Sequence, residues 1–134
     1  FFHFYILLKR EDKKYMKTIT VKGTNYTLKL SIRRAINLEK TLGTNPANVM
    51  MAMAMNQAQM PNMGGMIAIL HEALQPMNHG MSLDATYDLV DDWFADGHSI
   101  ADLIQLIVEV LQDSGLLPKE EEVKEEPKKA SKNA

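Results

Sequence analysis

The chain has 134 residues, 46% hydrophobic and 24% charged, with a formal net charge of −2, a composition typical of one globular domain rather than a disordered or membrane protein. It contains no cysteine, which excludes disulfides, thiolate zinc sites and cysteine nucleophiles and favours a reducing, cytoplasmic setting. Residues 41–117 hold nine acidic side chains and no Lys or Arg, so this part would repel a phosphate backbone and we expect no nucleic-acid binding.

Residues 1–15, FFHFYILLKREDKKY, are unlike the sequence that follows. They lack the basic start and the cleavage site of a secretory signal, and their apolar opening is far shorter than the roughly 20 residues that span a bilayer. The codons of residues 9–12 can contain the purine-rich sequence of a bacterial ribosome-binding site, a few codons before Met16. We therefore expect residues 1–15 to be a non-native translated leader, Met16 to be the natural start, and the protein to have no membrane segment.

A β-hairpin is expected over residues 17–30. Residues 18–21 and 26–30 alternate in polarity and are rich in β-branched or aromatic side chains, and residues 22–25, KGTN, supply turn chemistry between them. An isolated hairpin is marginal in water, so this one must pack on helices or pair with another sheet edge.

Five helices are expected, at about 32–42, 46–60, 64–75, 82–96 and 99–113. Ser31 and Ser82 can cap the first and the fourth, and Pro46 suits the first turn of the second. Ser99, with Asp102 three residues later, resembles a capping box that starts the fifth.

Apolar side chains recur every three or four residues in these helices, which predicts faces that pack on a core. In the first helix they are Ile32, Ala35, Ile36, Leu38 and Leu42, and in the fourth they are Leu83, Tyr87, Val90 and Phe94. The fifth helix has apolar residues beyond its stripe and is expected to be central. The sequence thus predicts a single mainly α domain (α+β) over residues 16–117, a compact helical domain with a small N-terminal β-hairpin.

The C-terminal segment has a different composition. After Pro118 it reads KEEEVKEEPKKASKNA, with five Glu, five Lys and a single Val. Such a segment buries too little apolar surface to offset its ordering entropy, so residues 118–134 are expected to be a disordered charged tail.

Charge is unevenly distributed along the domain. Six basic residues and one acid lie between residues 16 and 40, before the acidic stretch that follows. The acids are either solvated helix faces or a docking surface for a basic partner or a neighbouring copy. The candidate residues for electrostatic docking are Asp84, Asp88, Asp91, Asp92, Arg33 and Arg34.

No catalytic, cofactor or metal residues are expected. His71-Glu72 invites comparison with the HExxH zinc motif, but the second ligand position holds Gln75. His79 and His98 have no second ligand at a fixed spacing, and the aspartates of residues 84–96 have the spacing of a helix face rather than of a calcium loop. The chain also lacks a phosphate-binding glycine pattern and a nucleophile elbow, so we expect that it is not an enzyme.

Residues 49–66, VMMAMAMNQAQMPNMGGM, hold seven of the ten methionines. Such a cluster either fills an irregular core or forms an adaptable apolar surface that binds another protein. The candidate partner-binding residues are Met50, Met51, Met53, Met55, Met60, Met63 and Met66.

The hairpin followed by TLKLSIRRAINLEKTLGTNP, helices and a Lys/Glu tail resembles the tail assembly chaperones of long-tailed, lambda-like phages (siphoviruses), in particular those of phages and prophages of Gram-positive bacteria. The similarity runs from Met16 to the C-terminus and is most recognisable over residues 31–46. The resemblance implies a chaperone that binds the tape measure protein, keeps it soluble and helps recruit tail tube subunits in the host cytoplasm, without ATP. It also implies a longer form made by a frameshift near Lys128-Lys129 or Lys132-Asn133.

Two other functions suit the same residues. The chain could be a small oligomeric phage structural or scaffold protein, a homo-oligomer in which the basic hairpin end of one copy docks on the acidic end of the next and the methionines serve only its core. It could also be a regulatory adaptor of a host complex.

Overall fold

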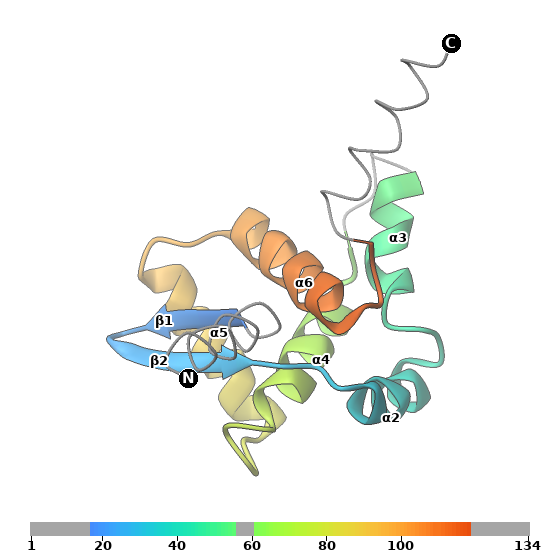
Figure 1. Cartoon of the computed structure of the whole chain (residues 1–134). Coiled ribbons are helices and arrows are strands. Elements are labelled where there is room, and N and C mark those ends of the chain that lie inside the picture. The colour runs from blue at the N-terminus through green and yellow to red at the C-terminus, as the bar shows by residue number, and fades with distance from the viewer. Residues whose placement is uncertain (1–16, 56–60, 119–134) are drawn as a thin grey trace, which may run out of the picture.

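The computed structural model describes residues 17–55 and 61–118, and of residues 52–55 it describes the backbone only. The elements follow in the order β1 (Lys17–Val21), β2 (Thr24–Leu28), α2 (Ile32–Leu42), α3 (Asn48–Met55), α4 (Met63–Leu74), α5 (Leu83–Ala95) and α6 (Ile100–Ser114) (Figure 1). The expected mainly α fold with an N-terminal hairpin is therefore confirmed. The predicted leader, Met16, Met60 and the tail from residue 119 onward lie outside the described residues.

The hairpin turn is shorter than residues 22–25. Lys22 and Gly23 both have positive φ, 48° and 81°, and Val21 already pairs with Thr24. Positive φ at both central residues is the backbone of a two-residue type I′ turn, whose twist matches that of the flanking strands. The second strand therefore begins at Thr24, two residues earlier than expected.

The second strand also ends early, because the chain leaves the hairpin to bond to a helix. The backbone N–H of Lys29 donates to the carbonyl of Ala73 in α4 at 3.0 Å. Ile19, Val21 and Leu28 are buried, and β1 packs on α5 and α6 while β2 packs on α4. The hairpin is thus covered by helices, as the sequence required.

The helix starts carry the expected capping residues. Ser31 Oγ accepts a hydrogen bond from the N–H of Arg34 at 3.3 Å, and Ser82 Oγ accepts one from Ala85 at 3.0 Å. At the start of α6 the N–H of Ser99 donates to Asp102 Oδ2 at 3.0 Å, which is one half of a capping box. These bonds satisfy backbone donors that have no partner within their own helix.

The centre of the domain is α4 and not α6, which corrects the expectation for the fifth predicted helix. In Figure 1 α4 lies among the other elements, and it packs against α2, α5, α6 and β2, whereas α6 packs against α4 and β1. The buried residues of α4 are Gly65, Met66, Ile67, Ile69, Leu70, Ala73 and Leu74. A helix that is apolar on most sides can be covered from several directions, whereas α6 keeps Gln105 on an exposed side.

In the part of the chain that the structure describes, none of the helices has both the length and the hydropathy needed to cross a bilayer.

Candidate functional site

The methionine-rich segment is divided between the core and the surface. Met50 and Met66 are buried at 3% and 0% exposure, while Met51 and Met63 are 41% and 47% exposed. The two buried side chains belong to the hydrophobic core and are not available to a partner in this fold. The exposed side chains of Met51 and Met63 are available to a partner. Met53 and Met55 belong to α3, but their side chains are not described. Met60 lies outside the described residues.

A close approach between two helices explains this division. A Cβ placed on Gly65 would lie 3.1 Å from both methyl carbons of Val49, so the start of α4 fits tightly against the start of α3. The Asn62 side chain fixes the same turn by accepting a hydrogen bond from the N–H of Gly65 at 2.9 Å. With α3 held in this way, Met50 faces the core and Met51, about 100° further round the helix, faces outward.

The exposed side of α2 carries two large apolar residues, which the stripe in the sequence did not predict. Ala35 and Leu38 are buried, but Ile32 and Ile36 are exposed. The two isoleucines border a hollow of about 110 Å³ whose lining residues are Ile32, Ala35, Ile36, Glu39, Asn45, Pro46 and Leu116. The α2 helix therefore carries a small apolar groove on the surface.

The buried face of α5 also differs from the predicted one. Its buried residues are Thr86, Leu89, Val90 and Trp93. Of the predicted apolar face Val90 is buried and Phe94 is half-buried, but Leu83 and Tyr87 are exposed. Thr86 occupies a core position because its hydroxyl donates to the carbonyl of Ser82 at 3.0 Å, which satisfies the buried polar group.

Part of the charge asymmetry is used inside the molecule. Lys17 Nζ lies 3.0 Å from Glu109 Oε1, and Lys22 Nζ lies 3.5 Å from Asp92 Oδ1. The N–H of Lys22 also donates to Asp96 Oδ2 at 2.7 Å. Basic residues from the start of the domain thus hold acidic residues from its end, and Asp92, a predicted docking residue, is one of them.

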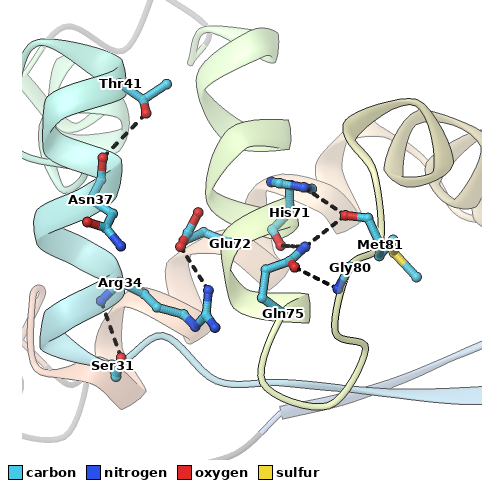
Figure 2. A network of polar contacts seen from close by, with 9 residues as sticks. All are labelled: Ser31, Arg34, Asn37, Thr41, His71, Glu72, Gln75, Gly80 and Met81. Carbon is cyan, nitrogen blue, oxygen red and sulfur yellow. Dashed lines mark hydrogen bonds and ion pairs between the residues drawn. The ribbon is translucent and has the colours of Figure 1, made fainter.

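The other predicted docking residues differ in exposure. Arg34 Nη1 lies 3.1 Å from Glu72 Oε1, so this arginine joins α2 to α4 (Figure 2). Arg33, Asp84, Asp88 and Asp91 are exposed. Within residues 17–55 and 61–118, none of these four residues takes part in an ion pair.

The His71-Glu72 pair, considered above as a zinc motif, has structural partners (Figure 2). His71 Nε2–H donates to the carbonyl of Met81 at 2.9 Å, and Gln75 Nε2 donates to the same carbonyl at 2.9 Å. The Gln75 side-chain oxygen accepts from the N–H of Gly80 at 3.3 Å. These bonds fasten the loop between α4 and α5 to the end of α4.

The two other histidines in the described part of the chain, His79 and His98, lie at the surface. His98 stacks on Trp93 with ring centroids 4.4 Å apart, and its Nδ1 lies 3.3 Å from Asp102 Oδ2. His79 is exposed. Among the described residues, His, Asp and Glu side chains do not gather in groups of three or more that could hold a metal ion.

The structure thus defines a mainly α domain with an N-terminal hairpin, whose outward-facing helices carry apolar side chains beside charged ones. The sequence matches a family of unknown function, DUF6096, over residues 12–133, and the chain belongs to that family. Comparisons with curated proteins and with solved structures gave no match.

Proposed function

We propose that this protein is a phage tail assembly chaperone that binds the tape measure protein, keeps it soluble in the host cytoplasm and helps recruit tail tube subunits, without catalysis. The proposal joins the resemblance of residues 16–134 to that class with one structural observation. Large apolar side chains stand exposed on several helices, and they include two methionines of the methionine-rich segment, Met51 and Met63.

Exposed methionines suit such a partner for a physical reason. A tape measure protein is a very long helix with repeated apolar stripes, which aggregates unless it is covered. Met has three rotatable bonds and a polarizable sulfur, so it can adjust to stripes of different sequence. Because Met50 and Met66 are used in the core, Met51 and Met63 are the described members of the segment that can make this contact.

Co-expression tests the proposal. A tape measure protein encoded beside this chain should stay soluble when the chain is present and aggregate when it is absent. The double variant Met51→Ser/Met63→Ser should weaken binding of soluble tape measure fragments about tenfold or more, since full burial of a methionine contributes about 1.5–3 kcal/mol and binding would cover the 41% and 47% of these two residues that are exposed.

Met77→Ser is the matched control, because Met77 is 59% exposed in the loop after α4 and lies outside the methionine-rich segment. It should leave binding unchanged. A tape measure protein whose solubility does not respond to this chain would overturn the function. A double variant that binds as well as Met77→Ser would move the contact to another surface.

The alternative, an oligomeric scaffold, is favoured by the exposed apolar residues of α2 and α5, which stand beside basic residues on α2 and acidic residues on α5.

A further inference from the structure

The exposed side chains of α2 form an ordered pattern. Ile32 and Ile36, four residues apart, make an apolar row, and Arg33 and Lys40 are exposed beside it. At about 100° per residue, Ile36 lies roughly 40° from Ile32, and Lys40 and Arg33 lie roughly 80° and 100° from it. We call these four residues the α2 face: an apolar row with a basic row along one side, while the exposed Glu39 lies roughly 20° from Ile32 on the other side.

The exposed side chains of α5 repeat this pattern with the opposite charge. Leu83 and Tyr87 make the apolar row, and Asp84 and Asp91 are exposed beside it. Counted from the first residue of each helix, the apolar positions and the charged positions are the same as in α2. These four residues are the α5 face.

We propose that the α2 face of one copy binds the α5 face of a second copy, with the two helices antiparallel. When two such helices bring their apolar rows together, the charged rows lie on the same side of the contact only if the helices run in opposite directions. The parallel arrangement puts the charged rows on opposite sides, where neither meets its counterpart.

The spacing of the charges fits this arrangement. Arg33 and Lys40 are seven residues apart, as are Asp84 and Asp91, which corresponds to about 10.5 Å along each helix. In the antiparallel register Arg33 meets Asp91 and Lys40 meets Asp84.

Both helices contribute an apolar side chain to the contact. In the same register Ile36 and Tyr87 lie within one residue of each other, about 1.5 Å along the helix axis, next to the hollow of about 110 Å³ beside α2. A cavity of about 150 Å³ is known to take a benzene ring, so this hollow, open to the surface, is of a size to receive part of the Tyr87 ring. Burial of this ring would supply much of the contact energy, because aromatic side chains bury large areas in interfaces.

The contact has to join different molecules. The α2 and α5 helices both pack on α4, which lies between them in Figure 1, so the α2 face and the α5 face of one copy are kept apart. Each copy then offers one face to each of two neighbours. A contact of this heterologous kind produces a closed ring or an open chain of copies. It needs no tape measure protein, so it is tested on this chain alone.

Light scattering with size-exclusion chromatography, over a range of protein and salt concentrations, measures the association. The average mass should rise with protein concentration and fall with added salt, which screens the charge pairs. Arg33→Glu and Asp91→Lys should each weaken association about fivefold or more. Lys29→Glu, the same charge change at an exposed lysine before α2, should have little effect.

Restoring opposite charges should restore binding. A chain with both Arg33→Glu and Asp91→Lys should associate as the unchanged chain does. A mass that remains that of one chain up to about 1 mM would overturn the proposal. So would a Lys29→Glu variant as weak as Arg33→Glu, or a combined variant that does not recover, with far-UV circular dichroism confirming that each variant is folded.

Cysteine cross-linking tests the geometry, since the chain has no cysteine of its own. A mixture of an Ile36→Cys chain and a Tyr87→Cys chain should form a mixed disulfide on mild oxidation. Either chain alone should form little. Cross-linking of Ile36→Cys with itself at a similar rate would indicate a symmetric contact and overturn the heterologous one.

Discussion

At the scale of single residues, neighbouring methionines have different roles. The sequence showed a cluster but not which members were covered, because a helix with apolar side chains on most sides gives no preferred inner face. The close fit of Gly65 on Val49 decides which methionines are covered. A contact between residues 16 positions apart cannot be predicted from periodicity. The signal in the sequence was the glycine pair itself, which permits close approach of a helix.

Serine substitution should separate the two roles. Met66→Ser should lower the free energy of unfolding by about 2–5 kcal/mol, because it leaves a cavity and a hydroxyl at a site with 0% exposure. Met63→Ser, three residues away and exposed, should change it by less than about 0.5 kcal/mol. Urea unfolding of both variants checks this. Equal losses would show that Met63 also carries core packing.

At the scale of elements, the positions of the helices were predictable and their rotation was not. Serine caps, prolines and glycines mark helix ends locally, so the predicted ranges lie close to the observed ones. The large apolar side chains of α2 and of α5, however, each spread over roughly 160° of arc at about 100° per residue, and which edge of that arc is buried depends on the neighbouring elements. On α5 the buried edge contains Leu89 and Trp93, and the edge with Leu83 and Tyr87 is left exposed.

The hairpin provides a test at the same scale. Gly23→Ala should cost about 1–2 kcal/mol, because Gly23 has φ of 81° and a Cβ is disfavoured there although nothing lies within 4 Å of it. Thermal unfolding of the variant measures the loss, and Thr24→Ala, an exposed strand position next to the turn, is the control. A loss no larger than that of the control would argue against the two-residue turn.

At the scale of the whole molecule, part of the charge asymmetry of the sequence is neutralised by ion pairs within the molecule. Part of it joins the first elements to the last, through Lys17 and Glu109 and through Lys22 and Asp92. Other charged residues, among them Arg33 and Lys40 of α2 and Asp84, Asp88 and Asp91 of α5, lie at the surface. The sequence predicted opposite charges at two ends of the domain, but pairing across the fold depends on topology and could not be predicted from it.

The ion pairs should differ in strength. A double-mutant cycle with Arg34→Met and Glu72→Gln should give a coupling of about 1 kcal/mol, because both side chains are largely covered. The same cycle with Lys22→Met and Asp92→Asn should give less than about 0.5 kcal/mol, because that pair is exposed to water. Chemical denaturation of the variants provides the energies. Equal couplings would contradict the burial of the first pair.

The bond from the Lys22 N–H to Asp96, 74 residues further on, bears on how the nascent chain acquires its fold. At a synthesis rate of about 5–20 residues per second, the hairpin waits roughly 4–15 seconds for that carboxylate to be made. During that interval the inner side of the hairpin has no helix α5 or α6 to cover it. Completion of the domain is therefore a late event, and a cellular holdase that shields short apolar strands would find its substrate in this interval.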